Sequence, residues 1–495
     1  MNILFAASEA FPYIKTGGLG DVVHALPAAL QKLGDDARIV LPAYRLILEQ
    51  GVNVVELGTL DVQGANTRHK MRILQVDDKK QDVVVYLIDI PALYDRAGNP
   101  YVDANGIVWP DNAERYVVFS RAVALLTKFL PGLKGGKAWV PEVVHSNDWQ
   151  TGLVPAFLSK MGNAPATVFT IHNLAYDGHF SYDEFTRLSL PAEWWSPDYI
   201  EFYDGFSMLK AGLVFSDAVT TVSPNYAKEI CTEKYGNRFE GVLSGLGDKF
   251  SGILNGIDLE IWNPETDPYI KQNYTYENNL MAAKRANKMD LLERTGLSKK
   301  QVPVLGFVGR LVEQKGIDLI ISILPELFEK TDVSIVILGA GQEHYEAQLI
   351  QLMDEWPDRL HIHIGYSEEL AHQIEAGCDL FLMPSMFEPC GLNQMYSLRY
   401  GALPIVTNTG GLTDTVVNVT FASLQDQTAT GFVMEADDAG SLLVSISHAL
   451  ELYKQSALWE QVIISAMMQD LGWDSSAQAY RKLYKSSRSG TRKTA

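Results

Sequence analysis

Short runs of apolar residues recur along this chain, and each run is followed by a turn and then by a segment of helical pattern. Examples are NILFAA, VVVYLIDI, TVFTIHN, VPVLGFVG, VSIVILGAG and CDLFLMPS. Runs that are apolar at successive positions are typical of strands buried on both faces, and helices between such strands serve as crossovers that keep the strands parallel. The pattern therefore predicts an α/β fold built on parallel sheets.

Both halves of the chain begin with the same order of elements. Near the N-terminus, Val22, Leu26, Leu30 and Leu33 repeat at helical spacing after a glycine-rich turn. In the second half the apolar positions after FVGRLVEQKG repeat in the same way, at Ile317, Ile320, Ile321, Leu324, Leu327 and Phe328. A chain of 495 residues has room for two or three domains of ~150 residues. We expect two doubly wound domains.

The expected domain boundary lies near ILNGIDLEIWNPETDP, residues 253–268, where a strand-like piece gives way to Asn, Gly, Asp and two prolines. We assign residues 1–254 to an N-terminal Rossmann-like domain and residues 255–470 to a C-terminal one. Residues 471–495 hold a final helix, SSAQAYRKLYKS, and a tail. From its pattern alone, this helix is able to pack on either domain.

Charge and cysteine content narrow the class of protein. The chain has 41 basic and 60 acidic side chains, a formal charge of −19, which opposes binding to nucleic acid. Cys231, Cys378 and Cys390 have neither metal-ligand spacing nor a disulfide pattern, as expected in a reducing compartment. The first residues lack the features of a signal peptide, and no window approaches ~18 uninterrupted apolar residues. We expect a cytoplasmic protein without nucleic-acid or membrane partners.

Four turns carry the candidate functional residues, because ligands of open α/β sheets bind beyond the carboxyl ends of the strands. They are KTGGLGD (15–21), TIHNLAYDG (170–178), GRLVEQKG (309–316) and PSMFEPCGLNQ (384–394). In the first turn, Gly17, Gly18 and Gly20 allow close approach of backbone to a ligand, and the following helix presents free N–H groups to an anion. Its spacing is neither that of a phosphate loop nor that of a dinucleotide fingerprint, so a purely structural turn remains an alternative.

The turn GRLVEQKG places two cations directly after a buried strand. Arg310 supplies a bidentate fork and Lys315 a mobile point charge, and together they are suited to neutralise a diphosphate leaving group. The alternative is a solvated loop in which these cations pair with Glu313.

Glu388 lies between a strand that ends at Pro384 and a helix that we expect to begin near Gly391. A carboxylate there can accept hydrogen bonds from sugar hydroxyls or stabilise developing positive charge, while the amides of Cys390, Gly391 and Leu392 open toward an anion. The alternatives are a carboxylate that only favours the start of the helix and a packing role for Cys390.

Polar residues also end two strands of the first half. His172 and Asn173 end ATVFTIH, and His145, Asp148 and Trp149 end EVVHSNDW. A histidine at the end of a strand is often a satisfied structural residue, and this alternative remains for each histidine. Together these residues predict a polar site on the first domain.

The ordered set of motifs resembles that of the bacterial glycogen synthases and is also similar to that of plant starch synthases, over nearly the whole chain. The motifs that carry the resemblance are KTGGLGDV, NDWQTGL, TIHNLAYDG, ILNGID, FVGRLVEQKG, FEPCGLNQ and TGGLTDTV. The resemblance implies a GT-B fold, in which two doubly wound Rossmann-like domains face a deep interdomain cleft and the C-terminal helix crosses back to the first domain. It also implies a retaining glycosyltransferase that moves glucose from ADP-glucose to the non-reducing 4-OH end of an α-1,4-glucan and releases ADP.

Functional residues are carried over only where the motifs match. As catalytic residues the resemblance implies Glu388 beside the transferred glucose, His172 lining the donor sugar, and Arg310 and Lys315 on the diphosphate. Tyr366, 22 residues before Glu388, matches the ring that stacks on adenine. The other residues implied to bind ADP-glucose are Lys15, Gly17, Gly18, Glu9, Asp21, Tyr101, Asp148, Asn173, Cys390, Gly391 and Leu392.

The chain departs from the family pattern at His24, Gln150 and Asn393, where Gly, His and Thr are common, so acceptor preference and fine sugar contacts stay open. The sequence contains no aspartate-rich cluster of the kind that binds magnesium in other transferases. We therefore expect no cofactor and no metal requirement, with the charge of the leaving diphosphate met by Arg310, Lys315 and helix N-termini.

Three other functions remain to be weighed. Another GT-B transferase, such as one that forms sucrose phosphate or trehalose phosphate, uses a different donor or acceptor. A dinucleotide-dependent oxidoreductase requires a fingerprint that KTGGLGD lacks. A non-catalytic glucan-binding protein has no reason to keep Arg310, Lys315 and Glu388 together. The oligomeric state, the strictness for ADP-glucose over UDP-glucose and the choice between a covalent and a same-face mechanism are open at the level of sequence.

Overall fold

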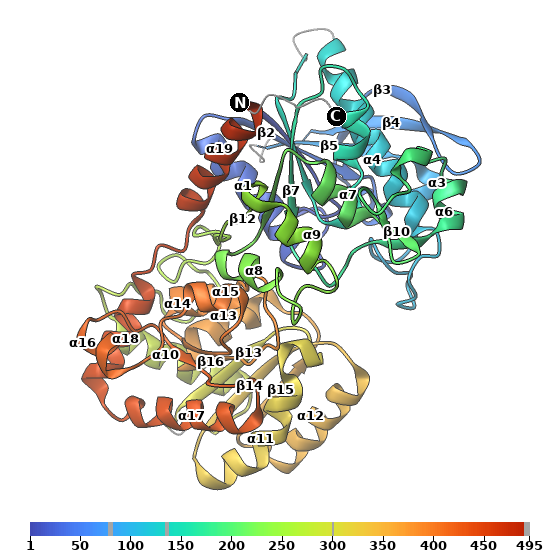
Figure 1. The fold of residues 1–495 in the computed structure, drawn as a ribbon. Coiled ribbons are helices and arrows are strands. Elements are labelled where there is room, and N and C mark those ends of the chain that lie inside the picture. The colour runs from blue at the N-terminus through green and yellow to red at the C-terminus, as the bar shows by residue number, and fades with distance from the viewer. Residues whose placement is uncertain (78–82, 134–137, 299–300, 490–495) are drawn as a thin grey trace. The chain divides into compact units, whose positions relative to one another are not determined.

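The computed structural model describes residues 1–77, 83–133, 138–298 and 301–489, and the chain divides into two compact units (Figure 1). Unit 1 combines Met1–Asn255 with the C-terminal segment that starts at Trp473, and unit 2 is Gly256–Gly472. The chain therefore leaves unit 1 at Asn255, inside the ILNGID motif, and returns to it after unit 2 is complete.

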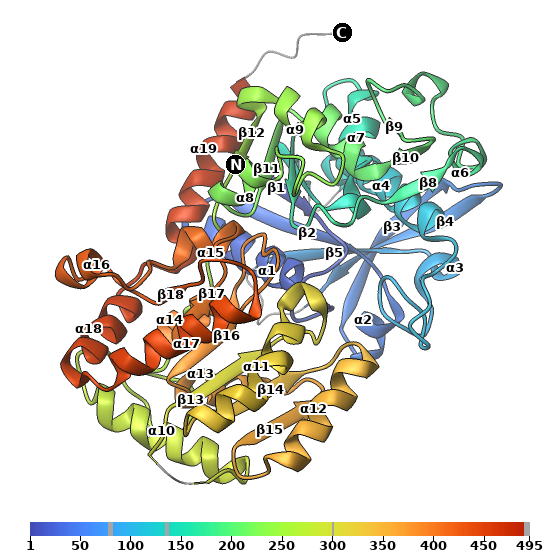
Figure 2. The ribbon, with the colours of Figure 1, turned by 60° about the horizontal axis from the view of Figure 1, so that its bottom comes forward.

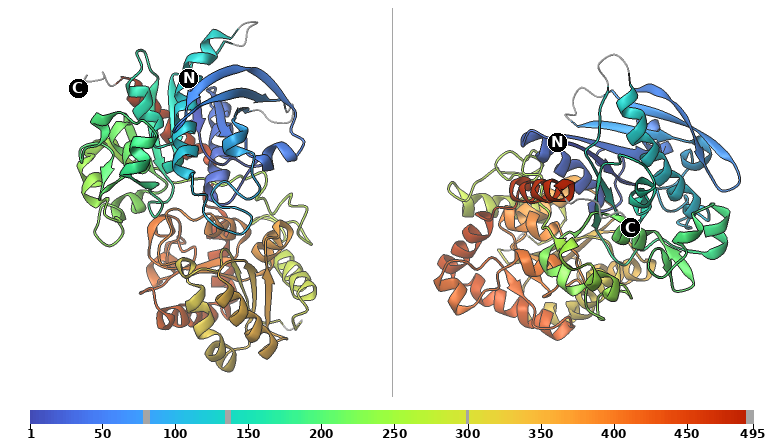
Figure 3. Two further views of the ribbon diagram at one scale, coloured as in Figure 1. Left: turned by 90° about the vertical axis from the view of Figure 1, so that its right-hand side faces the viewer. Right: turned by 45° about the horizontal axis from the view of Figure 1, so that its top comes forward.

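In the described part of the chain, unit 1 is built on a nine-stranded sheet with the order β12-β11-β7-β6-β1-β2-β5-β4-β3. Every neighbouring pair from β12 to β5 is parallel, and β4 and β3 add an antiparallel hairpin at one edge, drawn in blue in Figure 3. The strands are β1 (Asn2–Ala6), β2 (Asp36–Pro42), β3 (Val54–Gln63), β4 (Arg68–Val76), β5 (Val84–Asp89), β6 (Val143–Asn147), β7 (Ala166–Ile171), β11 (Ala218–Thr221) and β12 (Phe250–Gly252).

The inner strands of unit 1 have the burial that their apolar runs predicted. Every residue of β6 is buried, as is every residue of β1 after its first. The helices of this unit are α1 (Gly18–Lys32), α2 (Arg45–Glu49), α3 (Pro91–Tyr94), α4 (Asn112–Phe129), α5 (Val154–Ser159), α6 (Tyr182–Arg187), α7 (Met208–Phe215), α8 (Pro224–Glu229), α9 (Glu240–Gly245) and α19 (Trp473–Ser489). A small antiparallel sheet of β8 (His179–Ser181), β10 (Gly205–Ser207) and β9 (Glu201–Phe202) lies beside α6.

The C-terminal helix α19 packs against α1 and β7 of unit 1, and Figure 1 shows it in red beside α1. Its contact side carries Trp473, Ala477, Tyr480 and Tyr484, all buried and all part of the main core of the unit. The helix thereby covers apolar surface of a sheet whose strands were formed more than 200 residues earlier.

Unit 2 contains, among its described residues, a six-stranded parallel sheet with the order β15-β14-β13-β16-β17-β18. Helices α11, α12 and α17 cover one face of this sheet, and α10, α13 and α14 cover the other (Figure 2). Its strands are β13 (Val304–Val308), β14 (Ser334–Gly339), β15 (Leu360–Ile364), β16 (Leu380–Met383), β17 (Leu403–Val406) and β18 (Phe432–Val433). Its helices are α10 (Leu280–Arg294), α11 (Ile317–Lys330), α12 (Glu343–Glu355), α13 (Glu368–Gly377), α14 (Asn393–Tyr400), α15 (Gly410–Thr415), α16 (Phe421–Gln425), α17 (Ala439–Tyr453) and α18 (Ser456–Met467).

The strand order reverses once in each unit. In unit 1 the chain forms β1 and β2, adds β3, β4 and β5 on the same side of β1, and then returns to β6 on the opposite side of β1. In unit 2 it runs from β13 to β14 and β15 and returns to β16 in the same way. Both units are doubly wound, which confirms the predicted α/β class, and each has a topological switch point where ligands of such sheets bind.

Candidate active site

The switch point of unit 1 collects polar residues from three neighbouring strands. Ser8 and Glu9 follow β1, Asp148 follows β6 and His172 follows β7, and these strands are adjacent in the order β7-β6-β1. Since the carboxyl ends of parallel strands share one edge, the chain presents two carboxylates and an imidazole along a single side of this unit.

Glu9 is the buried centre of a hydrogen-bonded group. Its side chain accepts the Thr16 hydroxyl at 2.7 Å and the Thr16 backbone N–H, and it also accepts the hydroxyl of Tyr101. The Tyr101 oxygen is 2.9 Å from Ser8 Oγ. Burial and the neighbouring carboxylate raise the pKa of Tyr101 well above its ordinary value, so its hydroxyl remains a donor. Glu9 therefore holds both the glycine turn, through Thr16, and the loop of Tyr101.

The glycine turn exposes backbone and one cation beside the start of α1. Lys15 Nζ pairs with Asp21 Oδ1 at 2.8 Å, and 37% of the lysine side chain is exposed. A Cβ at Gly20 would lie 3.2 Å from the Lys15 side chain, whereas one at Gly17 would meet nothing within 4 Å. A side chain at position 20 would therefore require the Lys15 side chain to shift, whereas position 17 has open space. Gly17 and Gly18 are exposed at the N-terminus of a long helix, an arrangement that can accept an anion.

Asp148 has an uncommon backbone conformation, with φ of 56°. Its N–H donates to the Thr170 carbonyl at 3.0 Å, and its Oδ1 accepts the His172 N–H at 2.7 Å. Burial raises the pKa of the Asp148 carboxyl to about 7, although the backbone N–H groups of His172 and Asn173 oppose the shift. This carboxyl therefore titrates near neutral pH, where it can give or take a proton.

The protonation of His172 follows from its neighbour Asn147. The Asn147 Nδ2 donates to the carbonyls of Ala6 and His145, at 3.1 and 3.2 Å, which leaves Asn147 Oδ1 as an acceptor 2.9 Å from His172 Nε2. Nε2 therefore carries the proton and Nδ1 keeps its lone pair. Burial lowers the pKa of His172 to about 3, so the ring is neutral at physiological pH. The sequence provided no signal for Asn147 beyond its place before Asp148.

His145 belongs to the core of unit 1. Its Nδ1 is 2.8 Å from the Tyr484 hydroxyl and its Nε2 is 2.6 Å from Thr170 Oγ1, and only 1% of the residue is exposed. Of the two roles left open for this histidine, the structural one applies.

The switch point of unit 2 brings together a cation and a carboxylate from different turns. Lys315 Nζ lies 2.5 Å from Glu388 Oε2, and Ser385 Oγ donates to the same oxygen at 3.3 Å. Glu388 is 7% exposed. Arg310 is exposed and donates to Gln314 Oε1 at 3.0 Å. Lys315 therefore pairs with Glu388 and not with Glu313, and this pair joins the turns that follow β13 and β16.

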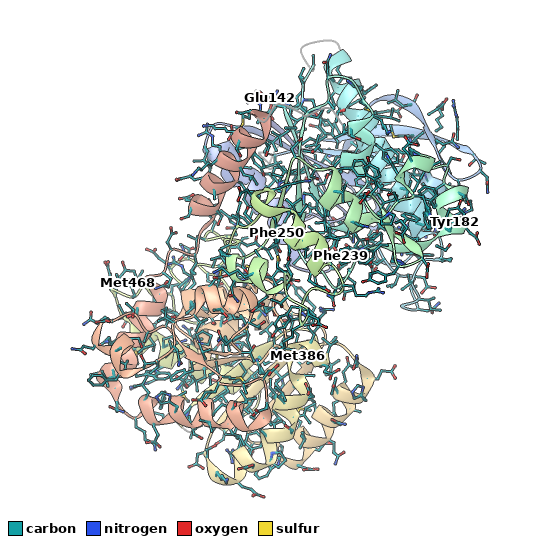
Figure 4. All side chains as sticks on the ribbon, in the orientation of Figure 1. Glu142, Tyr182, Phe239, Phe250, Met386 and Met468 are labelled. Carbon is teal, nitrogen blue, oxygen red and sulfur yellow. The ribbon has the colours of Figure 1, made fainter. Side chains whose placement is uncertain are left out.

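Backbone contacts clamp these two turns together. The Met386 N–H donates to the Gln314 carbonyl at 3.0 Å, and Gln314 Nε2 donates to the Phe387 carbonyl at 3.2 Å; Figure 4 labels Met386 on this turn. Gly316 has a φ of 69°, and a Cβ there would lie 2.0 Å from the Pro384 carbonyl oxygen. Only glycine permits so close an approach, so the pairing of Lys315 with Glu388 depends on it.

The motif TGGLTDTV supplies a second support for Glu388, which sequence reasoning missed. Gly410, with φ of 45°, would place a Cβ 1.9 Å from the Glu388 carbonyl oxygen, and the Gly411 N–H donates to that oxygen at 3.1 Å. A Cβ on Gly411 would lie 2.2 Å from the Cys390 carbonyl oxygen. The start of α15 thus lies directly against the Glu388 turn. The signal in the sequence was the glycine pair shortly after a strand.

The helix after Glu388 begins later than predicted. Helix α14 starts at Asn393 with Leu392 as its N-cap, because Gly391 has a left-handed φ of 71° that no α-helical residue adopts. Asn393 Nδ2 donates to the Val308 carbonyl at 2.6 Å and ties the helix to the end of β13. Cys390 is buried at 5% exposure, in keeping with packing.

Tyr366 lies at the far end of the same sheet edge. It follows β15, which is separated from β16 by β14 and β13, a distance of roughly 14 Å at the usual strand spacing. The ring is 76% exposed and its hydroxyl donates to the Glu368 carboxylate.

The structure thus distributes the predicted residues over both units. Those of unit 1 are Glu9, Lys15, Gly17, Gly18, Asp21, Tyr101, Asp148, His172 and Asn173, and those of unit 2 are Arg310, Lys315, Tyr366, Glu388, Cys390, Gly391 and Leu392. In the described residues there is no group of three or more His, Cys, Asp or Glu side chains arranged to hold a metal ion. Within the same residues, no helix combines the length and apolar character needed to span a membrane.

Comparison with known proteins agrees with this architecture. The family model described as starch synthase catalytic domain matches residues 2–245, and that described as glycosyl transferases group 1 matches residues 290–462. A glycogen synthase of Hydrogenovibrio crunogenus is 50% identical over 98% of this chain and 99% of its own, and glycogen synthase 2 of Nitrosococcus oceani is 47% identical over 98% and 96%.

Solved structures extend the comparison to three dimensions. The catalytic domain of starch synthase IV from Arabidopsis thaliana, bound to ADP and acarbose, has a TM-score of 0.89 at 32% identity and covers 99% of both chains. A sucrose-phosphate synthase from Thermosynechococcus elongatus has a TM-score of 0.61 at 16% identity, a likeness of fold alone. On these grounds the chain belongs to the glycogen and starch synthase family of GT-B glycosyltransferases.

Proposed function

We propose that this protein is an ADP-glucose-dependent glycogen synthase, which transfers glucose to the non-reducing 4-OH end of an α-1,4-glucan with retention of configuration and releases ADP. The observation that carries the proposal is the Lys315–Glu388 pair at the switch point of unit 2, 2.5 Å apart, in a chain that is 50% identical to a glycogen synthase over nearly its full length. An oxidoreductase or a passive glucan-binding protein has no use for that pair.

The pair suits a reaction that separates charge. As the bond between glucose and the diphosphate lengthens, negative charge grows on ADP and positive charge grows on the sugar ring. Groups placed for that state lower the barrier because they bind the transition state more tightly than the substrate. We assign Arg310 and Lys315 to the departing diphosphate and Glu388 to the oxocarbenium-like sugar. When Lys315 turns from Glu388 to the diphosphate, the carboxylate is released to face the ring.

The first-turn amides of α14 add to the same effect. Gly391 and Leu392 lead into this helix, so its unpaired N–H groups carry partial positive charge at the end of the sheet. We assign these amides, with that of Cys390, to the donor phosphates. Tyr366 provides the exposed ring on which the adenine stacks. The distance from β15 to β16 separates it from Glu388, and the ribose and diphosphate of the donor must span that distance.

In unit 1 we assign Lys15, Gly17 and Gly18 to the diphosphate and His172 with Asn173 to the donor sugar. The neutral His172 ring keeps Nδ1 as a hydrogen-bond acceptor for a sugar hydroxyl, since Nε2–H is occupied by Asn147. Asp148, Glu9, Tyr101 and Asp21 line the same edge of the unit.

We also propose that the reaction requires neither a metal nor a cofactor, because Arg310, Lys315 and Lys15 supply the positive charge that a metal ion provides elsewhere. Full activity after dialysis against EDTA is the expected result, and activity restored only by Mg²⁺ would contradict it. A cytoplasmic location is proposed as well, supported by the sequence positions of the three cysteines, which show no disulfide pattern.

The deciding experiment compares donors. Labelled ADP-glucose and UDP-glucose are incubated with glycogen or a maltooligosaccharide, and labelled glucan is measured. We expect transfer from ADP-glucose at a higher kcat/KM than from UDP-glucose, with new α-1,4 linkages. Transfer to sucrose-phosphate or trehalose-phosphate precursors without transfer to glucan would favour the other GT-B transferases, and transfer from neither donor would overturn the proposal.

A further inference from the structure

The exposed Tyr366 ring is tied to a buried histidine through a single carboxylate. The Tyr366 hydroxyl donates to Glu368 Oε2, while Glu368 Oε1 lies 3.5 Å from His372 Nε2, one helical turn later on α13. The two oxygens of Glu368 therefore face different partners. Ser367, between Tyr366 and Glu368, caps α13 by accepting the Leu370 N–H at 3.2 Å, which anchors the backbone of the group.

The His372 ring is held by a hydrogen bond to a carboxylate and by stacking on an aromatic ring. Its Nδ1 is 2.7 Å from Asp267 Oδ2, which also accepts the Tyr400 hydroxyl at 2.5 Å. The imidazole stacks on Trp262 with centroids 3.9 Å apart and an angle of 8°, and the other stacked partner of Trp262 is Tyr396 of α14 at 3.8 Å. The residue is 1% exposed.

The charge of His372 is set by its surroundings. The titratable groups that face it are Asp267, Glu368, Tyr400 and, through its ring at 5.1 Å, Tyr269. Burial disfavours the cation, but interactions with Asp267 and Glu368 outweigh burial and raise the pKa of His372. The Nε2 side of the imidazole faces the Glu368 carboxylate at 3.5 Å.

We propose that His372 is a positioning residue for the nucleobase: by holding Glu368, it fixes the Tyr366 ring in the orientation that stacks on the base of the donor. The inference rests on the proposed function, which places the base on Tyr366. A ring that is 76% exposed otherwise samples several rotamers and loses that freedom when the base binds. Fixing it beforehand removes this cost, which corresponds to an affinity change of about 2- to 10-fold for one side chain.

Tyr366 is exposed and Glu368 is partly exposed, so substitutions at these two positions allow a test that leaves the core intact. Tyr366→Phe keeps the stacking ring but removes its hydroxyl, and Glu368→Ala removes the carboxylate. Glu369→Ala is the matched control, since Glu369 lies in the same first turn of α13 but contacts Arg294 and Gln373 instead. We expect each of the first two variants to weaken ADP binding by about 2- to 10-fold and the double variant to bind no more weakly than either, while Glu369→Ala binds as the wild type.

Binding is measured directly by calorimetry with ADP and, separately, with inorganic pyrophosphate, which has no base. Pyrophosphate affinity is expected to be the same in the wild type and in all four variants, because Tyr366 contacts only the base. Equal losses for both ligands, or unchanged ADP affinity in Tyr366→Phe and Glu368→Ala, would overturn the positioning role. A wild-type protein that binds no ADP would instead overturn the proposed function, so the two failures are distinguishable.

The contribution of His372 is tested by substitution. His372→Gln is expected to weaken ADP binding as Glu368→Ala does and to leave pyrophosphate affinity unchanged, which a general loss of structure would not do. A His372→Gln protein that binds ADP as tightly as the wild type would contradict the role of His372.

Discussion

At the scale of single residues, the proposed chemistry depends on charges whose partners are now known. Lys315 pairs with Glu388, and Lys15 pairs with Asp21. Both cations thus have a carboxylate partner within their own unit, and an incoming diphosphate competes with that partner for each lysine.

Glu388→Gln is expected to lower kcat by about 100-fold or more, because it removes the charge that stabilises the developing cation, and removal of one such group commonly costs ~2.7–4 kcal/mol in the transition state. The affinity for ADP, measured by calorimetry, should change little. Glu313→Gln, on the neighbouring loop, is the control and should retain normal turnover. Near-normal kcat in Glu388→Gln would remove this residue from the catalytic group.

Lys15→Ala is expected to lower kcat/KM for ADP-glucose by about 10- to 150-fold, the loss of a charge-assisted contact worth ~1.5–3 kcal/mol. Steady-state kinetics with varied ADP-glucose provide the measurement. Lys32→Ala, in the last turn of α1, removes the same charge from the other end of the helix and should have no such effect. If KM and kcat/KM are both unchanged in Lys15→Ala, the lysine does not contact the donor.

At the scale of elements, the C-terminal helix α19 is joined to the central strand β6 by His145. The ring lies between Phe5, Tyr480 and Tyr484, and its nitrogens contact Tyr484 and Thr170. Burial, aided by the nearby His172, lowers the pKa of His145 to about 3. A neutral ring is therefore part of the interface between helix and strand.

This interface predicts a pH dependence of stability. The unfolded chain takes up a proton on His145 near pH 6.5, whereas the folded chain does so only near pH 3, so the unfolded state binds more protons between these values. The stability that the neutral ring confers is complete above pH 6.5 and is lost as pH falls, by about 1.4 kcal/mol per pH unit. Urea unfolding from pH 7.5 to 4.5 should show a shallower decline in His145→Gln than in the wild type. Equal slopes would contradict the assignment.

The helices and strands formed where the sequence pattern predicted them, and two details of position differ. The helical repeat after FVGRLVEQKG forms α11, in which Ile320 and Leu324 are buried as predicted but Ile321 is only partly buried and Ile323 takes the inner place. Helix α14, expected to begin near Gly391, begins two residues later at Asn393. In both cases local pattern located the element, and contacts with neighbouring elements decided the exact residues.

At the scale of the whole molecule, unit 1 is assembled from both ends of the chain. Trp473, Ala477, Tyr480 and Tyr484 belong to the main core of unit 1 although unit 2 lies between them and the rest of that core in sequence. Unit 2 contains neither the N-terminal segment Met1–Asn255 nor the C-terminal segment that starts at Trp473. The stability of unit 1 is therefore expected to depend on α19.

Deleting the segment from Trp473 onward is expected to destabilise unit 1 selectively, because it exposes the apolar surface that α19 covers and removes the partner of His145. Loss of large buried aromatic side chains typically costs ~3–5 kcal/mol each. Scanning calorimetry should show a transition of unit 1 at a markedly lower temperature, with the transition of unit 2 retained. Single substitutions at exposed α19 positions, such as Lys482→Ala, serve as the control. A truncated protein with an unchanged profile would contradict the dependence on α19.

Local sequence patterns were sufficient to predict that this chain forms parallel α/β sheets and that its polar turns lie at their carboxyl ends, because apolar runs and helical repeats reflect burial at each position. Its motifs also pointed to the family and to Glu388, Lys315 and Lys15. Three contacts became known only from the three-dimensional structure: Lys315 faces Glu388, 73 residues away, the Gly411 N–H donates to the Glu388 carbonyl, and Asn147 sets the tautomer of His172. These contacts, like the docking of α19, arise from strand order, which brings together residues that no local pattern connects.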